Sequence, residues 1–309
     1  MTWVSWRLQR TETLIVLGIL ALLAALLVPT GIEMANAYHQ DGLGACLPIN
    51  PGPACAQELG NFQQRFQTLT NVANWFTLIP GLIGVLLAAP FIFDLEHRTY
   101  RLAWTQSITR GRWLLGKLGL AAAAALLAAG ALALLFTWWR TPDSQINGRL
   151  ETGIYDTTGT VVIGYTFFAL ALALALGAVW RRAAASLTVA FVGYFAARIF
   201  VDFWLRDRLV PAAHATWKGN HQPHSLNNAH IISLNGTIHG HQIFGGGSGF
   251  FGGNHVQVRA PGIANTVFHA VYQPESHYWP LQLTETGLYL ALAAILIGLA
   301  AWWTHQRAT

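Results

Sequence analysis

The stretch that decides the fold is VVIGYTFFALALALALGAVW, which occupies residues Val161–Trp180. A helix needs about 20 predominantly apolar residues to cross a bilayer, and no residue of this stretch is charged. Its last residue, Trp180, is of the type that gathers at membrane–water interfaces. The stretch therefore predicts a membrane-spanning helix.

Working outward from this stretch, five more segments have the composition of membrane spans. They are Thr13–Thr30, Trp75–Phe93, Trp113–Trp139, Ala183–Leu205 and Leu281–Trp303. Hydrophobic residues make up 53% of the 309 residues and charged residues only 10%, whereas a typical soluble domain has about 25% charged residues. The sequence predicts an all-α membrane protein with six transmembrane helices in a single domain, residues 1–309.

The basic residues predict the orientation of the spans, because Lys and Arg are enriched in cytoplasmic loops. Ten lie on one side: Arg7, Arg10, Arg98, Arg101, Arg110, Arg112, Lys117, Arg181, Arg182 and Arg307. The opposite short loops are mostly acidic. We therefore expect both termini in the cytoplasm of a bacterial cell. The net charge of +5 does not indicate nucleic-acid binding, since the basic residues are spread between spans rather than gathered on one face.

The first span has a second interpretation as a cleaved signal peptide. Met1–Arg10 is basic, an apolar run follows, and Ala35-Asn-Ala37 resembles a cleavage site. The apolar run is longer than a usual signal-peptide core, so a retained span is preferred.

Cys46 and Cys55 are the two cysteines, and both fall in one loop predicted to lie outside the cell. A metal-binding pair would more often be spaced C-x2-C, whereas disulfides form in oxidising compartments. We predict a disulfide between them, with two free thiols as the alternative.

The segment Arg206–Pro280 is predicted to be an irregular extracytoplasmic loop region before the last span. It is polar and Gly-rich, and we expect two short strands in it, Ile231–Leu234 and His255–Arg259. It carries nine of the twelve histidines, and three of them are weak candidates for a zinc or copper site. These are His221, His224 and His230. Because no metal-binding motif accompanies them, a solvated loop is the preferred interpretation and no metal is assigned.

Two charged residues inside the fifth span are candidates for an intramembrane ion pair. Arg198 and Asp202 are four residues apart and so share a helix face. Charges within spans are often functional, and the alternative is an interfacial pair that reaches toward the headgroups.

One segment resembles a nucleotide-binding motif but lacks a residue that the motif needs. Gly111–Lys117 matches most of a phosphate-binding loop, but Leu118 stands where Ser or Thr is needed to hold magnesium. We therefore expect no cofactor and no catalytic residue in this chain.

The most informative loop runs from Asp94 to Lys117. It is too long for a simple connection, and it combines Arg with Trp104, the residue types that dominate binding hot spots. Residues alone leave two interpretations open, a docking element for a cytoplasmic protein and a loop that only fixes topology. The residues in question are Glu96, Arg98, Thr99, Arg101, Trp104, Thr105, Gln106, Arg110, Arg112 and Lys117.

This loop resembles the motif between the second and third spans of permeases of ATP-binding-cassette (ABC) transporters, in the type-2, exporter-like class and its actinobacterial form. Tyr272–Trp279, followed by Gln282 and Glu285, is a supporting match, and Trp6–Arg10 is a weaker one. The chain departs from the family at Arg98, where Gly is usual, and at His277, where Arg is usual.

The resemblance implies a permease subunit that couples ATP hydrolysis in a separate cytoplasmic ATPase to export of a substrate. ATP and magnesium would be bound by that ATPase, and a second permease copy or paralogue would complete the pore. Residues 94–112 would be the cytoplasmic coupling loop, and residues 1–12 an amphipathic connecting helix on the lipid bilayer. A drug, an antibiotic or a lipid-like compound is the expected substrate.

Two other functions stay open from the sequence. The His-rich loop could make the chain an extracytoplasmic metal-binding membrane protein. Alternatively, the Arg- and Trp-containing loop could belong to a membrane scaffold or sensor that docks a partner other than an ATPase.

Overall fold

The computed structural model describes residues 2–46, 53–97, 110–219, 223–226, 228–238, 241–247 and 265–306. Within them, six helices are long and apolar enough to cross a membrane, as the sequence predicts. These spans are Thr11–Gln40, Ala54–Glu96, Leu115–Trp139, Val161–Trp180, Ala183–Leu209 and Glu275–Thr304. The expected strand His255–Arg259 lies outside the described residues.

The main helical elements of the six spans follow one another along the chain. They are α1 (Thr2–Gln40), α2 (Pro53–Asn74) with η2 (Trp75–Leu78) and α3 (Ile79–Glu96), α5 (Arg110–Trp139), α8 (Val161–Trp180), α9 (Ala183–Phe200) and α11 (Tyr278–Gln306). The second span is longer than predicted, because the polar helix α2 continues the apolar helix α3. Residues 2–10 are continuous with the first span in α1, and Ala35–Ala37 lies inside the same helix.

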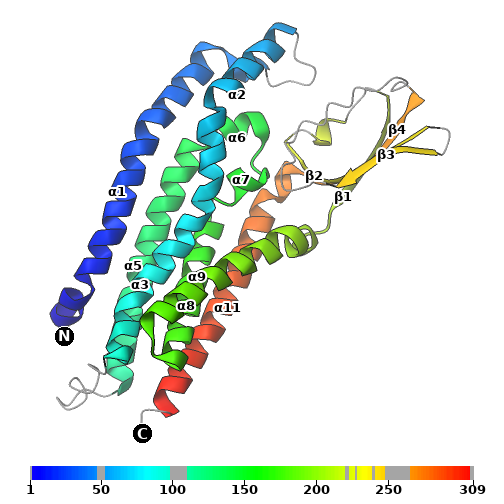
Figure 1. The fold of residues 1–309 in the computed structure, drawn as a ribbon. Coiled ribbons are helices and arrows are strands. Elements are labelled where there is room, and N and C mark those ends of the chain that lie inside the picture. Colours follow the sequence, from blue (N-terminus) through cyan, green and yellow to red (C-terminus); the bar gives the residue numbers. More distant parts are fainter. Residues whose placement is uncertain are drawn as a thin grey trace.

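Helix α8 forms the centre of the bundle and packs mainly against α3 and α11 (Figure 1). Of its apolar window 72% is buried, the largest share among the six spans. A Cβ atom on Gly84 of α3 would lie 2.3 Å from the Thr166 carbonyl oxygen of α8, so only glycine permits this approach. Small residues at such crossings are how membrane helices come into close contact.

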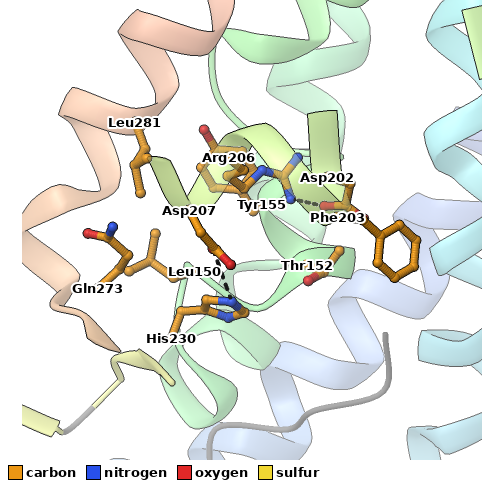
Figure 2. A pocket seen from close by; sticks show the side chains of 10 residues that line it. All are labelled: Leu150, Thr152, Tyr155, Asp202, Phe203, Arg206, Asp207, His230, Gln273 and Leu281. Atoms are coloured by element: carbon orange, nitrogen blue, oxygen red, sulfur yellow. Dashed lines mark hydrogen bonds and ion pairs between the residues drawn. The ribbon is translucent and has the colours of Figure 1, made fainter. Parts of the chain in front are cut away.

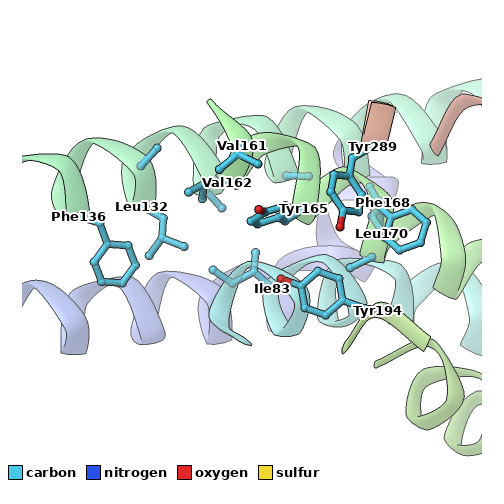
Figure 3. Close-up of a cluster of buried hydrophobic side chains, with 14 of the residues drawn as sticks. Ile83, Leu132, Phe136, Val161, Val162, Tyr165, Phe168, Leu170, Tyr194 and Tyr289 are labelled. Carbon is cyan, nitrogen blue, oxygen red and sulfur yellow. The ribbon is translucent and has the colours of Figure 1, made fainter. Parts of the chain in front are cut away.

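The core contains large aromatic side chains contributed by several helices. Tyr165 and Phe168 of α8, Tyr194 of α9 and Tyr289 of α11 are buried, and the rings of Tyr165 and Tyr289 meet edge to face at 5.0 Å (Figure 3). The peripheral spans α1 and α11 have only 22% of their apolar windows buried. Their exposed Leu and Ile side chains form the surface that a bilayer would cover.

The segment before the last span is more regular than the sequence indicates. It folds into an antiparallel sheet with strand order β1-β4-β2-β3, formed by β1 (Ala213–Lys218), β2 (His230–Ile238), β3 (His241–Gly247) and β4 (Val267–Gln273). The expected strand Ile231–Leu234 lies within β2. The prediction of an irregular region was wrong in this respect, because β1 alternates inward apolar residues with outward polar ones and pairs with β4.

The bundle has two distinct ends (Figure 1). The sheet lies at one end together with the short helices α6 (Thr141–Asn147) and α7 (Thr152–Tyr155); we call this the sheet end. Helix α1 begins and α11 ends at the opposite end, near the end of α3 and the α8–α9 turn; we call this the loop end.

Candidate functional site

A cluster of five charged side chains lies buried at the sheet end, where four parts of the chain meet. Asp156 follows α7, Arg198 is on α9, and Glu285 is on α11. Asp202 belongs to η3 (Val201–Leu205), and Arg206 begins α10 (Arg206–Leu209). We refer to Asp156, Arg198, Asp202, Arg206 and Glu285 as the ion cluster.

The two guanidinium groups of the ion cluster bridge its carboxylates. Arg198 contacts Asp156 through Nη2 at 2.6 Å and Glu285 through Nη1 at 3.4 Å. Arg206 contacts Asp156 through Nη2 at 2.5 Å and Glu285 through Nε at 3.0 Å, and it also pairs with Asp202. Both arginines lie on the span Ala183–Leu209, and each connects the end of that span to the α7–α8 connection and to α11.

Tyrosine side chains surround the cluster and satisfy its remaining polar atoms. The Tyr165 hydroxyl donates to Glu285 Oε1 at 2.6 Å and accepts a hydrogen bond from Arg198. The Arg198 guanidinium lies 3.8 Å from the Tyr165 ring centre, and that of Arg206 lies 4.4 Å from the ring centre of Tyr155. Such cation–π contacts are stronger when they are desolvated.

The cluster is buried enough for its charges to depend on one another. Side-chain exposure ranges from 0% for Glu285 to 14% for Asp202. Removing one partner from a buried ion pair costs about 3–5 kcal/mol, because the other charge is left uncompensated. The cluster therefore connects the spans, and the loss of any one of its charged side chains destabilises the fold.

Asp156 stays ionised in this setting. Burial acts to raise the pKa of Asp156, but Arg198 and Arg206 outweigh it and hold the pKa below its ordinary value. Burial, together with the charge of Glu285, raises the pKa of the Tyr155 phenol, so that this group stays protonated.

The structure does not contain the predicted ion pair between Arg198 and Asp202. Arg198 pairs with Asp156 and Glu285, whereas Asp202 pairs with Arg206. The physical reason is that Arg198 reaches two carboxylates on other elements, whereas Asp202 has Arg206 one turn further along its own span. The helix changes from α to π geometry at Val201, where the backbone N–H bonds to the carbonyls of both Ala197 and Arg198, and such turns are frequent at functional sites.

A small pocket opens beside the cluster (Figure 2). Asp202 and Arg206 line it together with Asp207 and with His230 of β2, whose Nε2 lies 4.0 Å from Asp207 Oδ1. Burial lowers the pKa of His230, although Asp207 acts in the opposite direction. The cavity volume of about 60 Å³ has room for a few water molecules and is far below the roughly 300–1,000 Å³ of drug-sized ligand sites.

The Gln282 side chain is hydrogen-bonded to the α7–α8 connection, which contains Asp156. Its Oε1 accepts a hydrogen bond from the first amide of α8, at Val161, at 2.9 Å. Its Nε2 donates to the carbonyls of Tyr155 and Thr158, each at 3.2 Å. Gln282 and Glu285, adjacent on one face of α11, thus fix the α7–α8 connection and the ion cluster respectively.

A second buried ion pair lies in the same end of the molecule. Arg140 Nη1 contacts Asp143 Oδ2 at 2.7 Å, and Nη2 donates to Asn74 Oδ1 at 3.1 Å. Glu151 lies nearby; burial, reinforced by Asp143 and opposed by Arg140, raises the pKa of Glu151 to about 7.

At the loop end, two of the residues predicted for coupling make contacts that tie the helices together. Glu96 Oε2 accepts a hydrogen bond from the backbone N–H of Ala183, the first residue of α9, at 3.0 Å. Lys117 forms a buried ion pair with Asp94 of α3. Gly111–Lys117 lies within helix α5, so the run that resembles a phosphate-binding loop does not form a loop.

The remaining predicted coupling residues are only partly within the structure. Arg110 and Arg112 lie in the first turn of α5, and Arg112 is exposed. The others lie outside the described residues: Arg98, Thr99, Arg101, Trp104, Thr105 and Gln106.

The cysteines and histidines are placed as follows. Cys55 is disulfide-bonded, and the other cysteine of the sequence is Cys46, at the end of η1 (Leu43–Cys46). His221 lies outside the described residues, His224 is in η4 (His224–Leu226), and His230 faces Asp207. In the part of the chain that the structure describes, no three His, Cys, Asp or Glu side chains form a group suited to a metal ion.

Three residues of this site were not identified from the sequence, and a fourth was assigned no role. Asp156, Tyr165 and Arg206 were not singled out, and Glu285 was noted only as a supporting match. The available signal was the position of Glu285, an acid four residues into the last apolar run, because ionisable residues within spans are rare and usually functional.

The fold and the ion cluster define a multi-pass helical membrane protein whose spans are joined by buried charges. Residues 17–206, more than half of the chain, match the family described as ABC-2 membrane transporter related. The chain belongs to this family. No curated protein and no solved structure matches the chain.

Proposed function

We propose that the chain is the membrane-spanning permease subunit of an ATP-driven exporter of the actinobacterial form. A separate cytoplasmic ABC ATPase would bind ATP and magnesium, and a second permease copy or paralogue would complete the transporter. Family membership supports a transport role, and the expected substrate is a drug, an antibiotic or a lipid-like compound.

The observation that carries this proposal is the arrangement of side chains at the base of residues 94–112. The Glu96 carboxylate is bonded to the first amide of α9 at 3.0 Å. The Asp94–Lys117 pair joins α3 to α5 and is buried, with 4% exposure at Lys117. A force applied to the coupling loop therefore reaches α3, α5 and α9 together, as a packed element with two arrangements requires.

Helix α9 extends this connection across the bilayer. It begins at Ala183, where Glu96 binds, and carries Arg198 near its other end, within the ion cluster. We infer that movement at the loop end shifts α9 and thereby repacks the ion cluster at the sheet end. The loop end would face the cytoplasm and the sheet end the outside of a bacterial cell membrane, consistent with the basic residues and with a disulfide at Cys55.

The test is copurification of a tagged full-length chain from native membranes in mild detergent, with identification of partners and an ATPase assay. We expect a stoichiometric cassette ATPase that Trp104→Ala weakens or uncouples. The matched control is Trp75→Ala, since Trp75 is 71% exposed at the opposite end of the second apolar span.

Wild-type yield of an ATPase with Trp104→Ala, and unchanged substrate-stimulated turnover, would contradict the coupling role of the loop. Recovery of no ATPase from membranes in which the chain is abundant would contradict the permease function itself.

A further inference from the structure

The ion cluster does not balance its own charge. It contains three carboxylates, Asp156, Asp202 and Glu285, but only two guanidinium groups, Arg198 and Arg206. With every group ionised, one negative charge would remain at the outer part of a membrane-spanning bundle. A buried charge without compensation is strongly unfavourable, and such a site takes up a proton or a cation instead.

The contacts identify which carboxylate lacks compensation. Glu285 accepts hydrogen bonds from Tyr165 and both arginines, with the shortest at 2.6 Å. Asp156 is bonded to Arg198 at 2.6 Å and to Arg206 at 2.5 Å. Within the described part of the chain, Asp202 pairs with Arg206 alone, and Arg206 is shared with both other carboxylates.

Asp202 is also the most solvent-exposed side chain of the ion cluster. Its side chain is 14% exposed, the largest fraction in the cluster, and it lines the small pocket at the sheet end (Figure 2). The same pocket is also lined by the titratable residues Tyr155, Asp207 and His230. The charged and titratable groups that face Asp202 are Arg206, Arg198, Asp156 and Glu285, with Asp207 and His230 in the same pocket.

We propose that the ion cluster binds one exchangeable proton on Asp202, taken from the solution at the sheet end through this pocket. When Asp202 is protonated, the two arginines face two carboxylates, and Arg206 is free to hold Asp156 and Glu285. When the proton leaves, three carboxylates compete for two arginines, and the junction between α9–α10 and α11 is weakened. The proton therefore closes the sheet end, and its loss favours opening.

This inference concerns the charge of the chain itself and does not require the proposed ATPase partner. It is tested on the purified full-length chain in lipid nanodiscs, in the absence of ATP. Spin labels at Phe200→Cys and Trp279→Cys, both exposed at the sheet end on α9 and α11, report their separation as a function of pH.

We expect the separation to change with the slope of a single proton and to be shortest at low pH. Asp202→Asn should abolish the change and fix the short distance, because the amide imitates the protonated acid. Asp207→Asn is the matched control, since Asp207 lines the same pocket but, within the described residues, forms an ion pair with His230 and not with the cluster arginines; its pH response should persist. Asp202→Glu keeps a carboxyl group and should respond to pH even if the asparagine variant folds poorly.

A pH response that survives in Asp202→Asn overturns the proposal. So does a response that disappears in His230→Gln, which would assign the proton to the histidine. A separation that follows sodium or potassium concentration at constant pH, rather than pH, would show a metal cation in place of the proton. The pH-dependent infrared band of protonated carboxyl groups should be weaker in Asp202→Asn than in the wild type by the contribution of one group, and should keep its full intensity in Asp207→Asn at pH values where Asp207 is ionised.

Discussion

At the scale of single residues, Arg206 is the member of the ion cluster on which most contacts converge. It pairs with Asp156, Asp202 and Glu285, and its guanidinium lies over Tyr155. Arg208, two residues further on, is exposed, and among the described residues it donates to the Trp204 carbonyl and lies over the Trp204 ring. The two arginines are neighbours in sequence with opposite environments, which makes them a natural pair for comparison.

We predict that Arg206→Gln lowers the free energy of unfolding by about 3–5 kcal/mol, because three buried carboxylates would then face one arginine. Arg208→Gln should change it by less than about 1 kcal/mol, as expected for an exposed charge. Thermal or denaturant unfolding in detergent measures both. Equal effects of the two substitutions would show that the cluster does not hold the spans together.

Glu151 gives a second prediction, concerning pH. Its pKa in the folded chain is raised to about 7, from 4.5, by burial and by Asp143. A raised carboxyl pKa means that the folded state binds the proton more tightly, so this group's stabilisation is complete below pH 4.5 and lost as pH rises through 7.

We therefore expect the melting temperature to fall between about pH 5 and pH 8 in the wild type, and to fall less in Glu151→Gln. Glu58→Gln, an exposed acid on α2, should leave the wild-type slope unchanged. If the melting temperatures of the wild type and both variants depend on pH in the same way, Glu151 does not cause the pH dependence. Asp156 acts in the opposite direction at more acidic pH, since its pKa is lowered.

At the scale of elements, the Glu96 side chain joins α3 to the beginning of α9. Its carboxylate accepts from the first amide of that helix, where unpaired N–H groups and the helix dipole favour a negative charge. Arg181 takes the left-handed conformation, with φ of 54°, immediately before this point. The α8–α9 turn is therefore tightly shaped and attached to the base of the coupling loop.

We predict that Glu96→Ala lowers the free energy of unfolding by about 1 kcal/mol, the usual cost of losing a helix cap. It should also reduce the coupling between a bound ATPase and transport much more than this stability change explains. Glu96→Gln, which retains an acceptor oxygen, should keep most of the coupling. Stimulated ATPase turnover in the reconstituted complex measures the effect, and wild-type turnover with Glu96→Ala would show that α9 is not driven from this point.

The α1–α2 hairpin gives a prediction for the disulfide at Cys55. Closing a loop of roughly ten residues contributes about 2–3 kcal/mol in the chain-entropy description. We expect Cys55→Ser to lower the free energy of unfolding by up to this amount and to give the same gel mobility with and without reductant. A reductant-dependent mobility shift that persists in Cys55→Ser would place the disulfide elsewhere.

At the scale of the whole molecule, the six spans could be predicted from apolar runs, because a bilayer requires about 20 apolar residues from each helix. The ion cluster could not, because its members come from four separate parts of the chain and no local spacing relates Asp156 to Glu285. The pair Arg198–Asp202 was wrong for the same reason, since the carboxylates that Arg198 contacts, Asp156 and Glu285, are distant from it in the sequence. The strand β1 did carry a signal, the alternation of apolar and polar residues.

Orientation is the prediction that belongs to this scale. We expect the sheet end to be outside the cell and the loop end to be cytoplasmic. Glu58→Cys and Arg112→Cys are both exposed and lie toward opposite ends. A membrane-impermeant thiol reagent should label Glu58→Cys in intact cells and Arg112→Cys only after permeabilisation, and the reverse pattern would invert the topology.

The central position of α8 has a consequence for how the chain is made. Helices α3 and α11 cover α8 from two sides, and α11 is synthesised after the other five described spans. Until it arrives, Gly164 of α8 lacks the backbone of Thr286, which a Cβ atom would approach to 3.2 Å, and both cluster arginines lack Glu285. The packing around α8 is therefore completed only after α11 has been synthesised, and a chain truncated before α11 would present an open, charged face that membrane quality control can recognise.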